Sequence, residues 1–122
     1  MGIVYLARER ASGTQVAIKL LSASTADSAD AALRFAREAR TVAALDHPNI
    51  VRTLGIEGLE RGAVAIVNEY VEGETLRAVL RASGPLPFDR AADVLRGVAG
   101  ALAHAHERRI VHRDVKPENI FI

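Results

Sequence analysis

The sequence contains no cysteine and carries almost no net charge. Without a thiol, disulfide bonds and thiolate chemistry are excluded, which fits a reducing compartment. The 16 basic and 15 acidic residues leave a formal net charge of +1, so we expect no nucleic-acid partner. No apolar run approaches the length of a membrane span, and the first residues do not resemble a signal peptide. What remains, 49% hydrophobic and 25% charged residues, is typical of a soluble globular protein.

The first half of the chain has the pattern of a small sheet with one helix. Its short β-branched and aromatic runs are bounded by turn residues, as strands require. A helix is expected from Asp27 or Ser28, either of which can cap it, to Leu45. It ends before Pro48, because the residue preceding proline avoids helical angles. The expected strands are residues 3–7, 14–21, 51–56 and 63–67.

The second half, after residues 69–73, has helical patterns and a final loop. Apolar residues recur on one face of a long segment, and Pro117 prevents any helix from continuing through the last residues. The expected helices cover residues 75–82 and a longer stretch from residue 87 or 88 to about residue 108. His104 and His106 stand two residues apart on that longer helix and point to different sides, so we interpret them as structural and not as a metal pair.

Residues 112–119 read His-Arg-Asp-Val-Lys-Pro-Glu-Asn. This is the pattern of the protein kinase catalytic loop, H-R-D followed by four residues and Asn. Phosphoryl transfer requires mainly positioning and neutralisation of charge. Asp114 would accept or orient the proton of the attacking hydroxyl, Lys116 would offset charge on the phosphate, and Asn119 would bind Mg²⁺ through its amide oxygen. The alternative, a solvated charged loop, is disfavoured because every position of this segment agrees with one pattern.

With this motif the chain resembles the eukaryotic-like (Hanks-type) serine/threonine protein kinases of bacteria, over essentially its whole length. A lysine at position 116, two residues after Asp114, resembles the serine/threonine subgroup of the family and not the tyrosine kinases. The resemblance implies that His112 is a scaffold residue and that Arg113 pairs with a phosphorylated activation loop. It also implies the family's bilobal α+β fold, here truncated, with ATP and Mg²⁺ as cofactors and a serine or threonine hydroxyl of a protein as the acceptor.

A second motif, Val-Ala-Ile-Lys at residues 16–19, resembles the third strand of the kinase fold. Strand alternation puts Ala17 and Lys19 on one face, where a small residue beside an ammonium group suits an adenine wall next to a phosphate clamp. Val4, on the neighbouring strand, would cover the adenine. Taken alone, a lysine on a strand is more often a solvated edge charge.

Glu38 supports the functional interpretation of Lys19. It borders the apolar stripe of the first expected helix, so its carboxylate should turn inward and needs a cationic partner. The resemblance supplies that partner, because the family's lysine and glutamate form the ion pair that aligns the lysine on the nucleotide phosphates. The alternative is a surface pair between Arg34 and Glu38, four residues apart on the helix.

Three further features match the nucleotide site of the family. Gly2 corresponds to the last glycine of the phosphate loop, of which the chain supplies only the end. Glu69 and Val71 resemble the hinge, whose main-chain groups would pair with the adenine edge. Asn68 occupies the gatekeeper position, where the family usually has an apolar residue or threonine, so its buried amide must find a partner or make the pocket unusual.

The resemblance divides the chain into three parts: residues 1–68, an amino-terminal lobe without its first strand; residues 69–73, the hinge; and residues 74–122, the start of the helical lobe. Lys19, Glu38, Asp114 and Asn119 are all present, so we expect the parent domain to be an active kinase. No D-F-G segment follows the catalytic loop in this chain, so we expect the chain alone to be inactive. We expect a cytoplasmic location, leaving open a membrane anchor, dimerisation or autophosphorylation of the parent. Two rival functions are a kinase-like module that binds nucleotide or a partner without catalysis, and a small-molecule kinase, which Lys116 disfavours.

Overall fold

The computed structural model describes residues 3–21, 40–59 and 63–122. Two compact units are present, and the boundary in the chain falls between Tyr70 and Val71. The first unit contains the sheet and the helical residues 40–43. The second contains two longer helices and the final loop, together with the short segment His47–Ile50. No sequence pattern predicted that this short segment would group with these two helices.

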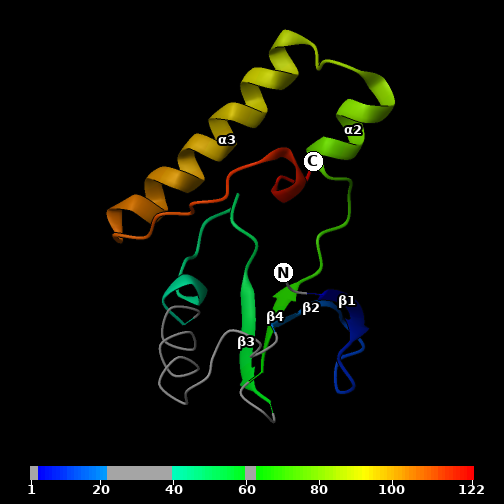
Figure 1. Cartoon of the computed structure of the whole chain (residues 1–122), viewed down its shortest axis with the longest axis vertical. Coiled ribbons are helices and arrows are strands. Elements are labelled where there is room, and N and C mark those ends of the chain that lie inside the picture. Colours follow the sequence, from blue (N-terminus) through cyan, green and yellow to red (C-terminus); the bar gives the residue numbers. More distant parts are fainter. Residues whose placement is uncertain (1–2, 22–39, 60–62) are drawn as a thin grey trace. The chain divides into compact units, whose positions relative to one another are not determined.

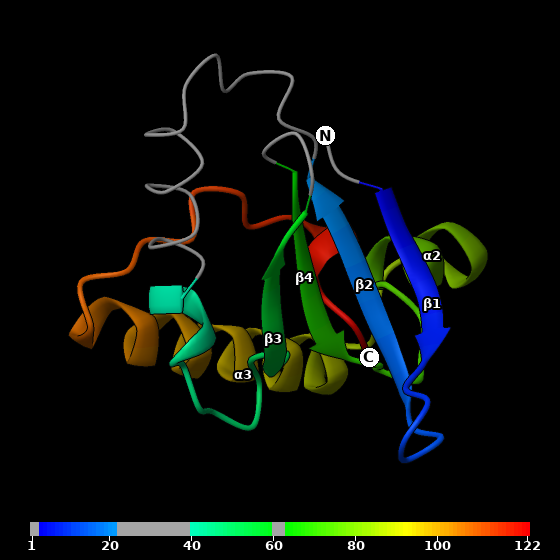
Figure 2. The same cartoon turned by 90° about the horizontal axis from the view of Figure 1, so that it is seen from below.

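The first unit is built on an antiparallel sheet of four strands in the order β1-β2-β4-β3 (Figure 2). Its core is formed by Val16, Val64 and Ala65 of the strands and by Leu45, all of them buried. Strands that follow one another in the chain pair as antiparallel neighbours, β1 with β2 and β3 with β4, because turn residues between them reverse the chain. The strands are β1 (Ile3–Arg8), β2 (Gln15–Leu21), β3 (Thr53–Gly58) and β4 (Val64–Glu69).

All four strands differ by one or two residues at one or both ends from their predicted ranges. The third strand starts at Thr53 and not at residue 51, because the chain first completes a turn in which Ile50 N–H donates to the His47 carbonyl at 3.0 Å. The helix predicted to reach Leu45 is helical over residues 40–43 and then tightens, with Leu45 N–H bonded to the Val42 carbonyl at 3.0 Å. The rest of that predicted helix lies outside the described residues.

The second unit contains two helices, α2 (Leu76–Ser83) and α3 (Phe88–Glu107) (Figure 1). Thr75 caps α2, since its Oγ1 accepts a hydrogen bond from Ala78 N–H at 3.2 Å. Gly84 ends the helix with a positive φ of 75°, a conformation that suits glycine. Both helices lie within about a residue of their predicted ranges. Among the described helices, none is both long and apolar enough to cross a membrane.

The end of the chain returns to the start of α2. Pro117–Asn119 forms a single 3₁₀ turn, η2, beside α2 (Figure 1). Beyond it, Phe121 forms an isolated antiparallel bridge with Thr75. The sequence correctly excluded an α-helix here, and a 3₁₀ turn is compatible with Pro117 because a proline at the first position lacks only an N–H that would be unpaired anyway.

Candidate functional site

The sheet of the first unit brings the candidate nucleotide-binding residues onto one face. Ala17 and Lys19 stand two residues apart on β2, so they share a face as predicted. The register then places Val4 of β1 directly opposite Lys19 and Asn68 of β4 directly opposite Ala17. Directly paired residues project to the same side of a sheet. Val4, Ala17, Lys19 and Asn68 therefore form one continuous surface.

Two predicted members of this site, Gly2 and Glu38, lie outside the described residues. The Lys19–Glu38 ion pair consequently stays a prediction, as does the alternative pair with Arg34. Lys19 itself is exposed. Its side chain projects from the same face of the sheet as Ala17, as was predicted from the Val-Ala-Ile-Lys motif.

The amide of Asn68 has a partner that the sequence did not reveal. Thr53 Oγ1 donates a hydrogen bond to Asn68 Oδ1 at 3.0 Å, and the two residues are direct partners across β3 and β4. Both side chains are partly buried, so this bond satisfies the amide oxygen of the residue predicted to occupy the gatekeeper position. Only the strand register could have identified Thr53, because it stands 15 positions away in sequence.

Glu69 is held at the end of the sheet by Arg52. The Glu69 N–H donates to the Arg52 carbonyl at 2.9 Å, and the Glu69 carboxylate accepts from Arg52 N–H at 2.7 Å. The side chain of this predicted hinge residue thus stabilises the strand end, which was not foreseen. Val71, the other predicted hinge residue, is the first residue of the chain's second unit after this strand and is half-buried.

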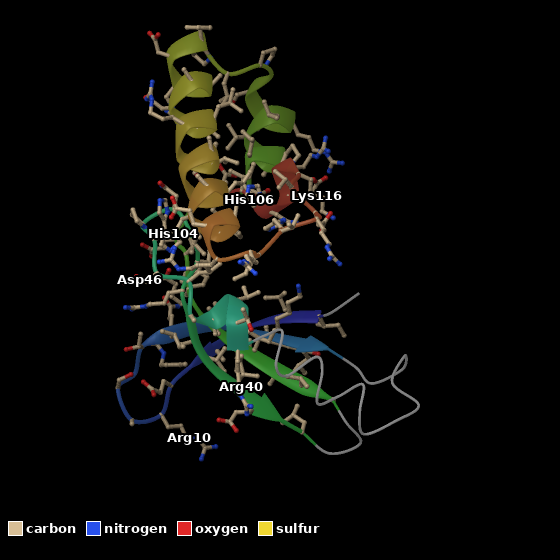
Figure 3. All side chains as sticks on the ribbon, turned by 90° about the vertical axis from the view of Figure 1, so that its left-hand side faces the viewer. Arg10, Arg40, Asp46, His104, His106 and Lys116 are labelled. Carbon is tan, nitrogen blue, oxygen red and sulfur yellow. The ribbon has the colours of Figure 1, made fainter. Side chains whose placement is uncertain are left out.

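In the second unit, Asp114, Lys116 and Asn119 form one cluster. Lys116 Nζ lies 2.8 Å from Asp114 Oδ2, and Figure 3 shows Lys116 on the loop after α3. Asn119 Nδ2 donates to both the main-chain carbonyl of Asp114, at 2.8 Å, and its carboxylate, at 3.1 Å. Asp114 N–H donates to His112 Nδ1 at 3.2 Å. The motif residues therefore hold one another within a single loop.

These contacts favour the charged forms of Asp114 and Lys116. Hydrogen bonds from Lys116 and then Asn119 lower the pKa of Asp114 below its ordinary value of 3.8. The same contact with Asp114 raises the pKa of Lys116 above 10.5. Near neutral pH, Asp114 is therefore a carboxylate and Lys116 an ammonium ion, which are the forms that the predicted roles require.

The loop reaches this geometry through one unusual backbone angle and one tight turn. Arg113 has a φ of 63°, in the left-handed region that residues other than glycine seldom occupy. The 3₁₀ turn that follows is closed by Asn119 N–H donating to the Lys116 carbonyl at 2.9 Å. Strained backbone of this kind is common where side chains must be aimed at a shared point.

The amide oxygen of Asn119 is a suitable ligand for a hard divalent cation. With Nδ2 of Asn119 donating to Asp114, the amide oxygen Oδ1 is the atom that can bind a cation. Mg²⁺ uses one or two protein oxygen ligands and completes its shell with phosphate oxygens and water. Across the part of the chain that the structure describes, no group of three or more His, Cys, Asp or Glu residues could hold a metal without such help.

His104 and His106 lie in different surroundings on α3 (Figure 3). His104 is half-buried and stacks at a tilt on His47, with the ring centroids 5.2 Å apart. Its Nδ1 also lies 3.2 Å from an Arg108 nitrogen. His106 is exposed. These contacts give His104 a packing role on the helix.

Comparison with known proteins identifies relatives along the entire chain. Residues 1–122 match the family described as protein kinase domain. Serine/threonine-protein kinase PrkC of Bacillus subtilis is 44% identical over 122 residues, covering 100% of this chain and 19% of the relative. Serine/threonine-protein kinase pkn2 of Myxococcus xanthus is also 44% identical over 122 residues, with 100% and 14% covered. PknB of Mycobacterium leprae is 42% identical over 125 residues, with 100% and 20% covered.

A solved structure is similar as well. The crystal structure of Rad53 residues 1–466 in complex with AMP-PNP superposes with a TM-score of 0.89 and 31% sequence identity, covering 99% of this chain and 31% of that one. The α+β kinase fold predicted from the sequence is thereby confirmed. The chain spans a fifth or less of the length of these curated relatives.

Proposed function

Because the chain belongs to the protein kinase domain family, we propose that it forms part of a catalytic domain that transfers the γ-phosphoryl group of ATP to a serine or threonine hydroxyl of a protein. The observation that carries this proposal is the cluster around Asp114, whose carboxylate lies 2.8 Å from Lys116 Nζ and 3.1 Å from Asn119 Nδ2. The relatives named serine/threonine-protein kinases support the choice of acceptor.

In the proposed reaction, the loop orients the acceptor and neutralises charge. The Asp114 carboxylate accepts a hydrogen bond from the substrate hydroxyl, which aims the oxygen at the γ-phosphorus. Since hydrogen bonds lower the pKa of Asp114, it acts mainly by orientation until the proton is released late in the transfer. Lys116, which lies 2.8 Å from Asp114 in this structure, turns its ammonium group to the transferring phosphoryl.

The nucleotide would lie against the face formed by Val4, Ala17 and Lys19. Val4 and Ala17 are small enough to cover a flat base, and Lys19 on the same face would bind the phosphates. The main chain at Glu69 and Val71 would pair with the adenine edge, and Asn68 would stand at the back of the base. Similarity to Rad53, solved in complex with AMP-PNP, supports a nucleotide ligand.

Asn119 would hold Mg²⁺ through Oδ1, and the ion would neutralise phosphate charge and fix the phosphate geometry. Glu38 would align Lys19, and Gly2 would allow the backbone to approach the phosphates. Arg113 would receive a phosphorylated segment of the parent protein. We further propose the lobe and hinge boundaries at residues 1–68, 69–73 and 74–122, a cytoplasmic site of action, and autophosphorylation of the parent protein.

The test is transfer of labelled γ-phosphate from ATP to the protein itself and to a generic protein acceptor, with Mg²⁺. The complete protein that contains this chain is compared with its Asp114→Asn variant. Asp93→Asn, the same change at an exposed carboxylate of α3, is the matched control. We expect transfer onto serine or threonine in the parent protein and the control, and its loss in Asp114→Asn. Nucleotide binding without any transfer would favour the binding-module alternative.

A further inference from the structure

The start of α2 and the end of the catalytic loop are joined by main-chain hydrogen bonds. Leu76 N–H donates to the Ile120 carbonyl at 2.7 Å. Ile122 N–H donates to the Glu74 carbonyl at 3.0 Å, and Glu74 N–H donates back at 3.3 Å. We call these two segments, residues 74–77 and 118–122, the α2 clasp. Its main-chain bonds fix the part of the loop that lies after Asn119.

Within the α2 clasp, one ion pair joins the side chains of the two segments. Arg77 Nε donates to Glu118 Oε1 at 2.8 Å, across 41 positions of sequence. Glu118 also lies within η2, directly before Asn119. Glutamate and arginine side chains are both ionised at neutral pH in their ordinary states. The charged contact is therefore present under physiological conditions.

Both side chains of this pair are 44% exposed. An ion pair with such access to water adds little to the stability of a fold. Its geometric effect is greater, because Arg77 stands on a rigid helix capped by Thr75, while Glu118 stands on a three-residue turn. Anchoring Glu118 therefore restricts the turn that also carries Asn119.

We propose that Arg77 is a positioning residue for the catalytic loop, acting through Glu118 to hold Asn119 at Asp114. This inference rests on the proposed function, because it concerns the residue that would bind Mg²⁺. The chain of contacts runs from the Arg77 guanidinium to the Glu118 carboxylate, along the η2 backbone to Asn119, and from Asn119 Nδ2 to Asp114 at 2.8 and 3.1 Å. Loss of the first contact allows the turn to move and lowers the fraction of molecules with Asn119 in place.

The test uses the complete protein and the variants Arg77→Gln, Glu118→Gln and their double mutant. Arg81→Gln is the matched control, because Arg81 is the same residue type in the last turn of the same helix and is also exposed. The first readout is the Mg²⁺ concentration that gives half-maximal nucleotide binding. The second is kcat and KM for ATP. The third needs no ligand: it is the rate of hydrogen exchange at the main-chain N–H of Asn119, which is bonded to the Lys116 carbonyl.

We expect Arg77→Gln to raise the half-saturating Mg²⁺ concentration and the exchange rate by about twofold to fivefold, the range that an exposed ion pair supports. The kcat value should fall more than KM for ATP rises. Glu118→Gln should match this change, and the double mutant should add nothing, since either change removes the same contact. The exchange of charges, Arg77→Glu with Glu118→Arg, should restore part of the loss.

The proposal is overturned if Arg77→Gln equals Arg81→Gln in Mg²⁺ dependence and in exchange at Asn119, even if its melting temperature is lower. It is also overturned if the two single changes add independently. Failure of the proposed function gives a different result, namely no transfer by the unmodified protein. In that case the Mg²⁺ dependence of nucleotide binding and the hydrogen exchange still decide the role of Arg77.

Discussion

At the scale of single residues, the account depends on how Asp114 is held. Its carboxylate receives hydrogen bonds from Lys116 at 2.8 Å and from Asn119 at 3.1 Å, and its main-chain N–H is bonded to His112. Two side chains that would also bind phosphate and metal therefore hold this aspartate in place beforehand. The loop is organised by the same groups that the reaction would use, so changes to one of them should be detectable at the others.

The first prediction concerns the ionisation of Asp114. Lys116→Met removes the largest cause of its lowered pKa, so the pKa should rise towards or above 3.8. Titration of the ¹³C carboxyl resonance of Asp114 measures this directly, and Lys116→Arg should retain most of the original shift. An unchanged pKa in Lys116→Met would show that the contact with Asp114 is absent in solution.

The sign of the pH effect on stability follows from the same contact. Asp114 has a lowered pKa in the folded state, so its contribution is present above its unfolded pKa and is lost as pH falls through the folded value. Lys116 has a raised pKa, so its contribution is present below 10.5 and is lost as pH rises above its folded value. Between about pH 5 and pH 9 the pair should leave the free energy of unfolding independent of pH.

At the scale of elements, the end of α3 shows a residue in an unfavourable conformation. Ile110 N–H bonds to the Ala105 carbonyl and Arg109 N–H to the His106 carbonyl, the pattern of a Schellman motif. Arg109 occupies the left-handed position of this motif with a φ of 60°. That position favours glycine, because any Cβ there meets the backbone. The helix therefore ends at some cost to stability.

The second prediction follows from that angle. Arg109→Gly should stabilise the protein by about 1 kcal/mol by relieving the left-handed strain. Thermal unfolding monitored by circular dichroism measures the change. Arg108→Gly serves as the comparison, since Arg108 has a φ of −96° and donates to the His104 carbonyl, so it should destabilise. Equal losses in both variants would contradict the assigned backbone conformation.

The third prediction concerns Gly73, beside the α2 clasp. Its φ is 142°, and a Cβ placed on it would stand 2.7 Å from the Ile122 carbonyl oxygen. Gly73→Ala should therefore cost about 1–3 kcal/mol and shift the end of the catalytic loop. Gly58→Ala, where a Cβ meets nothing within 4 Å, should be tolerated far better. Urea unfolding of both variants provides the comparison, and equal stability would argue against the close approach at Gly73.

Strands and helices could be predicted from the sequence where a local pattern of apolar and polar residues defines them. Alternation in residues 16–19 was sufficient to put Ala17 and Lys19 on one face, and the apolar repeat was sufficient for α3. Contacts between distant segments could not be predicted in this way. The bond between Thr53 and Asn68, the pair of Arg77 with Glu118 and the grouping of His47–Ile50 with the helices each depend on register or packing. No local pattern encodes such contacts.

At the scale of the whole molecule, the candidate functions are divided between the two units. The sheet of the first unit carries Lys19 and the surface proposed for the nucleotide. The second unit carries Asp114 and Asn119. The proposal therefore assigns nucleotide binding mainly to one unit and the orientation of the acceptor hydroxyl to the other. Such a division implies that the two activities can be separated by single substitutions.

The most direct test of this account compares Lys19→Met with Asp114→Asn in the complete protein, measuring both the dissociation constant for Mg²⁺–ATP and phosphoryl transfer to a protein acceptor. Lys19→Met should weaken nucleotide binding and transfer together. Asp114→Asn should leave the dissociation constant within about twofold of the unmodified protein and lower transfer by a hundredfold or more, about the contribution of a positioned acid–base group. Transfer by Asp114→Asn at the unmodified rate would contradict the assignment of residues 112–119 as the catalytic loop.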